Sequence, residues 1–335
     1  MDFDLSEVDT AWRDKGASLG RELAADPAAA GVVMGAAREG LLDPAATLLS
    51  IAAAVEAMAF ESPSAAVVFA LHSGTALAVA GDERFTSLFR GETVAAVSLS
   101  SDDMPVEEGG KLSGRAPWVA PITDHGIAVV GPKSGTQERV AFAVALDVPG
   151  VTIEPVTTAA LPGLIWGHVT FNGAACVPIG PTLPVMIRLR ILIAAAGLGI
   201  GRRALREALA TARAAKTHGQ GAGQAAAAGE QTVQGLLADA ATELDAAMLL
   251  TWKAALGTTV GTRLSLADAS MAKLASTGAV QRAVERATQV VGADSFQRGH
   301  IIERLAQDVR ALELFAGRTE ALREAVAAET LPEPG

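Results

Sequence analysis

Residues 167–201 read GHVTFNGAACVPIGPTLPVMIRLRILIAAAGLGIG, and the spacing of the apolar residues changes within this stretch. Up to about Pro181, short Val/Ile runs are separated by Gly, Pro and Asn, which is typical of β-strands joined by turns. From Leu183 the apolar residues recur every three or four positions, the period of a helix with a buried face. The sequence therefore predicts that a β region ends here and that a helical region begins.

The same two patterns of apolar spacing are found in the rest of the chain. Helical spacing fills the first quarter of the chain from Leu5 to about Arg90, and short Val/Ile runs follow it. The predicted fold class is α+β multidomain. We expect a helical N-terminal domain at 1–92, a β-barrel or β-sandwich middle domain at 93–182, and a C-terminal helical bundle at 183–330.

Composition narrows the classes of function. The 335 residues are 50% hydrophobic, which is enough for a large core, and only 4% aromatic. The formal net charge is −10 and Lys and Arg are scattered along the chain, so the sequence does not show the basic patch of a nucleic-acid-binding protein. We expect no nucleic-acid partner.

Cysteine usage and the N-terminus favour a cytoplasmic protein. Cys176 has no second cysteine to pair with, and the first residues are acidic where a signal peptide would be basic. The most apolar window, 183–201, contains Arg188 and Arg190, so we interpret it as a buried helix and expect no membrane association. The histidines lack the i, i+4 spacing of metal ligands, so no metal site is expected.

Several motifs in order resemble the acyl-CoA dehydrogenase family over nearly the whole chain. The resemblance is carried by AVAGDERFTSLFRGETVAAVSLS (78–100), KLSGRAPWVAPITDHGIAVV (111–130), AAGLGIGRRALREALATARAAKTHG (195–219), MAKLASTGAVQRAVERATQVVGADSF (271–296) and IIERLAQDVRALELFAGRTEAL (301–322). It implies a helical N-terminal domain, a β middle domain and a C-terminal four-helix bundle. It also implies FAD, an acyl-CoA thioester substrate, a dimer or tetramer, and a glutamate base that removes the α proton while a hydride passes to the flavin.

The chain departs from the family at the base. Aligned without gaps, the last motif puts Ala316 at the glutamate position, and the alternative base position on the first bundle helix falls near Leu189. Neither side chain accepts a proton. Glu313 and Glu320 would share one face if the segment stays helical, which makes them weak candidates for the base. The alternative is that both are ordinary solvated glutamates.

Some residues of this chain match flavin-contacting positions of the family that it resembles. Trp118 matches the tryptophan that packs beside the flavin ring in the family, although it also fits a core aromatic at a domain junction. Ser98 and Ser100 are candidate hydrogen-bond donors, or simply polar residues at a strand end. Gln289 and Gly292 match a motif whose backbone approaches the FAD pyrophosphate of a neighbouring subunit.

Three functions remain open. The favoured one is a base-less FAD subunit of a hetero-oligomeric dehydrogenase, in which a partner subunit contributes the glutamate for α,β-desaturation of an acyl-CoA. The second is a stand-alone flavoenzyme with altered chemistry on a CoA- or carrier-bound substrate. The third is a non-catalytic scaffold.

Overall fold

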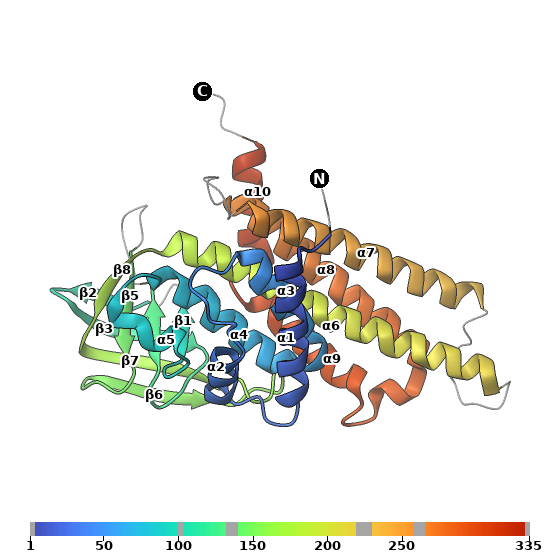
Figure 1. Cartoon of the computed structure of the whole chain (residues 1–335), viewed down its shortest axis with the longest axis horizontal. Helices are drawn as coiled ribbons and strands as arrows, with labels where there is room; N and C mark the ends of the chain where they lie inside the picture. The colour runs from blue at the N-terminus through green and yellow to red at the C-terminus, as the bar shows by residue number, and fades with distance from the viewer. Residues whose placement is uncertain (1–3, 100–103, 132–139, 219–229, 258–264, 332–335) are drawn as a thin grey trace.

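A computed structural model describes residues 4–99, 104–131, 140–218, 230–257 and 265–331 (Figure 1). Capping side chains start two N-terminal helices: the Ser6 and Thr47 hydroxyls accept hydrogen bonds from the Asp9 and Ser50 amides. The N-terminal part contains α1 (Glu7–Glu22), α2 (Ala29–Arg38), α3 (Leu48–Glu61), α4 (Pro63–Ala76), η1 (Leu77–Val79), η2 (Glu83–Phe85) and α5 (Thr86–Phe89).

The strands form two sheets of four. One has the order β1-β4-β5-β8 and the other β2-β3-β7-β6, and all described pairs are antiparallel except β1 with β4. Phe142, Phe171 and Leu112 belong to the apolar cluster of this region. The strands are β1 (Ala95–Ser98), β2 (Val106–Glu108), β3 (Lys111–Val119), β4 (Ile127–Val130), β5 (Val140–Ala145), β6 (Val151–Val156), β7 (Trp166–Ala175) and β8 (Val177–Pro181).

Helices return directly after β8 and form the C-terminal bundle. They are α6 (Thr182–His218), α7 (Gln231–Leu256), α8 (Leu266–Val291), η3 (Gly292–Phe296), α9 (Ile301–Leu314) and α10 (Thr319–Thr330). In Figure 1 the strands gather at one end of the molecule, the long helices extend toward the other, and the N-terminal helices lie between them. The predicted order of helical, β and helical segments is confirmed.

Helix α6 is the central element of the core. It packs against α3, α4, α7, α8 and α9. By length and composition it would span a bilayer, but 78% of its most apolar window is buried inside the protein, as in the core helix of a globular fold. One apolar cluster joins the N-terminal helices to the bundle through Leu192, Leu71 and Ile51.

Small residues allow the helices around α3 to approach very closely. A Cβ atom at Gly16 of α1 would clash with the carbonyl oxygen of Ala54, and one at Gly199 of α6 would clash with that of Glu56. Helix α3 is therefore held between α1 and α6 at backbone contact, a spacing that any larger side chain would disturb.

Candidate functional site

Trp118 stands at the end of β3 with its ring half exposed. Its φ angle is 53°, a left-handed conformation uncommon for a bulky residue, and the β3–β7 register shifts between Ala116 and Val119. The amide of Trp118 donates to Nδ1 of His168 at 3.4 Å, and 52% of the residue's surface is exposed. The irregular strand end thus turns a large aromatic ring toward solvent.

Three further rings continue from Trp118 toward the bundle. The ring centroids of His168 and Trp166, both on β7, lie 5.2 Å and 5.7 Å from that of Trp118, each edge-on. Phe315 follows α9, and its centroid lies 4.6 Å from that of Trp166. These four residues, called the aromatic row below, link the β region to the loop between α9 and α10.

That loop carries Ala316, and two basic side chains of the bundle donate hydrogen bonds to its carbonyl oxygens. Arg190 Nε of α6 donates to the carbonyl oxygen of Ala316 at 3.0 Å, and Lys273 Nζ of α8 donates to that of Gly317 at 2.6 Å. Lys273 also donates to the carbonyl of Glu313 at 3.1 Å, at the C-terminal end of α9, where a positive charge is favourable. Ala316 and Gly317 have φ angles of 53° and 113°, so the loop turns sharply between the helices.

Both cations are buried, Arg190 to 4% and Lys273 to 1% exposure. Burial and, to a smaller extent, the nearby charge of Arg190 lower the pKa of Lys273 to about 7, although Glu313 opposes the shift. Burial alone lowers the pKa of Arg190 to about 10. The loop that carries Ala316 is therefore in contact with two buried basic side chains.

The candidate carboxylates lie on either side of a helix break. Helix α9 ends at Leu314 and α10 begins at Thr319, so the continuous helix on which Glu313 and Glu320 would share a face does not form. The Glu313 carboxylate accepts a hydrogen bond from Gln281 Nε2 at 3.0 Å and lies 3.9 Å from Arg310. Glu320 is exposed in the first turn of α10.

The remaining predicted residues fall into two places. Ser98 of β1 lies near Trp118, and its hydroxyl donates to the carbonyl of Pro117 at 2.7 Å, while Ser100 lies outside the described residues. Gln289 is exposed near the end of α8, and Gly292 caps that helix with a φ angle of 76°. Both lie 16 or more residues beyond Lys273, which is about 24 Å along a helix.

A flavin fits this arrangement at Trp118 but gains no hydrogen bond from the side chain at residue 120. The exposed part of Trp118 is a surface on which a planar ring system can pack. At residue 120 the side chain is a methyl group, and the Ala120 amide already donates to Val97, so this position supplies no hydrogen bond to the ring. In the described part of the chain, no group of three or more His, Cys, Asp or Glu side chains is arranged to hold a metal ion.

Sequence reasoning did not find Lys273, Trp166 or Phe315 as site residues. Lys273 could have been noticed because it interrupts the small residues of MAKLAS on a buried helix face. The contacts of Trp166 and Phe315 depend on tertiary packing, and no local signal in the sequence indicates them.

Comparisons with known proteins agree with this architecture. The family model "Acyl-CoA dehydrogenase, C-terminal domain" matches residues 185–331. The chain is 27% identical over 248 residues to benzylmalonyl-CoA dehydrogenase of Aromatoleum aromaticum, a match covering 69% of this chain and 63% of that relative's length. Its fold matches butyryl-CoA dehydrogenase from Megasphaera elsdenii with a TM-score of 0.84 at 17% identity, covering 99% of this chain and 100% of the other.

A structure described as PigA with FAD and proline has the same fold, with a TM-score of 0.83 at 18% identity, and the match covers 98% of this chain and 99% of that one. The chain thus spans slightly less than two thirds of the benzylmalonyl-CoA dehydrogenase sequence, whereas its fold matches whole chains of known structure. The family model and the related sequence both indicate the acyl-CoA dehydrogenase family, and the solved structures show that the chain has the fold of butyryl-CoA dehydrogenase.

Proposed function

We propose that this chain is an FAD-binding subunit of an oligomeric dehydrogenase for acyl-CoA thioesters, and that a glutamate-bearing partner subunit supplies the base. The observation that carries the proposal is the loop at Ala316. A methyl group stands at the family's base position, and its own carbonyl is bonded to Arg190. The loop keeps its place between α9 and α10 but has no group to receive a proton.

Trp118 would hold the flavin ring from the β side, and the loop at Ala316 would face it from the bundle. Bound FAD would accept the hydride from the β carbon of the thioester. Trp166 and Phe315 pack against each other between the two elements. Gln289 and Gly292 lie far along α8 from Lys273, which suits contact with a cofactor of a neighbouring subunit.

The positive charge beneath the loop supports the assignment of the base to another chain. Arg190 and Lys273 donate hydrogen bonds to the carbonyl oxygens of Ala316 and Gly317. The Glu313 carboxylate is engaged by a hydrogen bond from Gln281 and an ion pair with Arg310. A carboxylate near these cations would be stabilised in its ionised form, which weakens it as a base.

Co-purification from the native host with an absorbance scan tests the proposal. A yellow complex that contains a second chain with a glutamate at the base position is the expected result. A yellow homo-oligomer active on its own would replace it with a stand-alone flavoenzyme, and a colourless homo-oligomer with a scaffold. Adding the purified partner to the purified chain should raise the rate of acyl-CoA desaturation by about 10² to 10⁴, the usual contribution of a positioned base.

A further inference from the structure

A short turn leads into β7 and its first residue, Trp166 of the aromatic row. The turn covers residues 161–164, and the amide of Leu164 donates to the carbonyl of Leu161 at 3.0 Å. Leu161 has a φ angle of 53°, although its side chain is fully buried. A bulky residue in the left-handed region is strained, so the surrounding structure has to hold Leu161 in this conformation.

Asp308 of α9 holds this turn from the side of the bundle. Its Oδ1 accepts a hydrogen bond of 2.6 Å from the amide of Leu161, across 147 residues of sequence. Asp308 is only 5% exposed, and burial raises the pKa of its carboxyl to about 6, although the bond from Leu161 and the charge of Arg304 oppose the shift. Among the described residues, the Leu161 amide is the only hydrogen-bond partner of this carboxyl. Burial of the carboxyl is costly, and what it secures is the position of the turn.

Two further contacts fix the turn on its other sides. A Cβ atom at Gly163 would lie 2.6 Å from Cγ of Pro27, so the turn lies directly against the segment between α1 and α2. The carbonyl of Ile165 accepts a hydrogen bond of 2.8 Å from the amide of Ile122, which connects the end of the turn to the β region. All three parts of the chain therefore hold the turn, and Asp308 provides the contact from the bundle.

Helix α9 is connected to the aromatic row at two points. Phe315 caps the C-terminus of α9, and its ring centroid lies 4.6 Å from that of Trp166. Asp308, about two helical turns earlier, holds the turn from which Trp166 follows. The ring of Trp166 also packs edge-on against that of Trp118. A displacement of the turn would therefore move Trp166 relative to both Phe315 and Trp118.

We propose that Asp308 is a positioning residue for the flavin, because its bond to the amide of Leu161 fixes Trp166 and, through Trp166, the ring of Trp118. This inference rests on the proposed packing of the flavin on Trp118. Asp308 is buried, so it acts on the flavin through the turn and not by contact. A binding surface keeps its affinity only while the residues behind it hold it in place.

Asp308→Ala and Asp308→Asn in the full chain test this role with two measurements. Quenching of flavin fluorescence gives the FAD affinity, and near-UV circular dichroism of the chain without FAD reports the packing of the tryptophan rings. Difference spectra of Trp118→Phe and Trp166→Phe assign the signal of this ring pair. Asp308→Ala should weaken FAD binding about fivefold, equivalent to about 1 kcal/mol, and reduce the ring-pair signal. The amide oxygen in Asp308→Asn still accepts the bond from Leu161, so both values should stay near those of the wild type.

Asp9→Ala is the matched control. Asp9 is also buried, at 7% exposure, and its Oδ1 accepts a hydrogen bond of 2.6 Å from the Ser50 hydroxyl across 41 residues, within the N-terminal helices. In urea unfolding, Asp9→Ala should lower the free energy of unfolding, as Asp308→Ala does. It should leave the FAD affinity and the ring-pair signal unchanged. Equal losses of FAD affinity in the two variants would assign the effect to general stability and overturn the proposal.

Asp308→Glu keeps the proposal testable if Asp308→Ala does not fold. It retains the carboxylate but displaces it by one methylene group, so FAD affinity and the ring-pair signal should both fall although the charge is kept. Wild-type values in Asp308→Glu, or a loss in Asp308→Asn as large as that in Asp308→Ala, would overturn the proposal. A wild-type chain that binds no FAD would overturn the proposed flavin site instead, and the ring-pair signal would still decide whether Asp308 positions Trp166.

Discussion

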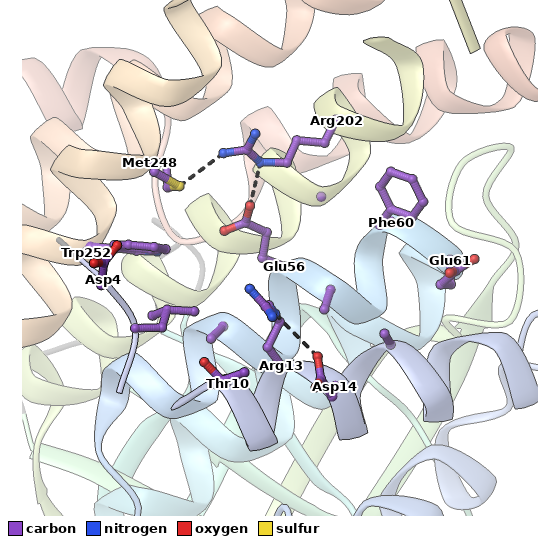
Figure 2. A pocket seen from close by; sticks show the side chains of 15 residues that line it. Asp4, Thr10, Arg13, Asp14, Glu56, Phe60, Glu61, Arg202, Met248 and Trp252 are labelled. Atoms are coloured by element: carbon purple, nitrogen blue, oxygen red, sulfur yellow. Dashed lines mark hydrogen bonds and ion pairs between the residues drawn. The ribbon is translucent and has the colours of Figure 1, made fainter. Parts of the chain in front are cut away.

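Two arginines of helix α6 differ in the charge of their hydrogen-bond partners. Arg190, beneath the loop at Ala316, bonds to a carbonyl oxygen and to the hydroxyl of Ser270 at 2.7 Å. Arg202 lies at a cavity lined by residues of α1, α3, α6 and α7, and it bonds to the carboxylates of Glu56 and Asp245 (Figure 2). Arg202 is thus paired with carboxylates at the cavity. Among the residues that the structure describes, Arg190 at the loop bonds only to neutral groups, whereas Lys273 has the Glu313 carboxylate nearby.

The difference has a consequence for each region. A buried cation without a carboxylate partner costs more to hold than a paired one, so a movement of the loop residues that solvate Arg190 would leave a desolvated charge. At the cavity the Arg202 pairs tie three helices together, and Arg13 pairs with Asp14. The loop at Ala316 is rigid and electropositive. At the open cavity, the charge of Arg202 is neutralised by carboxylates.

The largest expected effect is on catalysis. With flavin bound, the isolated wild-type chain should desaturate acyl-CoA substrates 10² to 10⁴ times more slowly than the chain with its partner, because a positioned base contributes about that factor. Ala316→Glu should restore only a small part of this rate, since Arg190 would pair with the new carboxylate and keep it ionised. Stopped-flow flavin bleaching measures both rates, with Ala316→Gln as control. A full recovery by Ala316→Glu alone would show that Arg190 does not restrain that position.

Lys273→Met should give the largest loss of stability. It removes the hydrogen bonds to Glu313 and Gly317 and leaves two carbonyls without a partner, which should cost about 2 kcal/mol. Between the unfolded pKa of 10.5 and the folded value of about 7, the unfolded chain binds more protons, so the Lys273 contribution makes stability rise with pH across this window. Urea unfolding at about pH 7 and about pH 9 should show that rise in the wild type and a reduced one in Lys273→Met.

Lys253→Met is the matched control for this experiment. Lys253 is exposed and pairs with Asp268 on the surface, so its loss should change stability by less than about 1 kcal/mol. Equal effects of the two substitutions would mean that burial does not set the behaviour of Lys273.

Trp118→Ala should weaken FAD binding by about tenfold, since it removes the exposed ring on which the flavin is proposed to pack. Trp118→Phe keeps an aromatic surface and should cost less. Trp252→Phe alters a tryptophan in the cavity and should leave FAD affinity unchanged. Quenching of flavin fluorescence during titration gives all three affinities, and an unchanged value for Trp118→Ala would remove this residue from the flavin site.

The sequence predicts the fold well because each type of secondary structure has its own local spacing of apolar residues. The change from short Val/Ile runs to a three-to-four period near Leu183 coincides with the end of β8 and the start of α6. Trp118 stands in a motif that local residues define, and its role at the flavin stays a prediction.

The electrostatics of the site could not be predicted in the same way. Arg190 and Ala316 are 126 residues apart, so only tertiary packing brings the guanidinium to that carbonyl. The break between α9 and α10 depends on left-handed residues at 316 and 317, and the alanine among them gives no signal of a turn. Assuming a continuous helix there placed Glu313 and Glu320 on one face incorrectly.

Glu56→Gln should have the smallest effect. The glutamine oxygen still accepts the hydrogen bond from Arg202 Nε, and Arg202 keeps Asp245 as a counterion. Since burial raises the Glu56 pKa, the folded chain binds more protons than the unfolded chain just above pH 4.5, so this group makes stability fall as pH rises. Removing it should change the free energy of unfolding at neutral pH by no more than about 0.5 kcal/mol, because the lost attraction to Arg202 is offset by the lost desolvation cost. Urea unfolding measures the difference, and a destabilisation above about 2 kcal/mol would mean that the ion pair at the cavity is as indispensable as the cations beneath the loop.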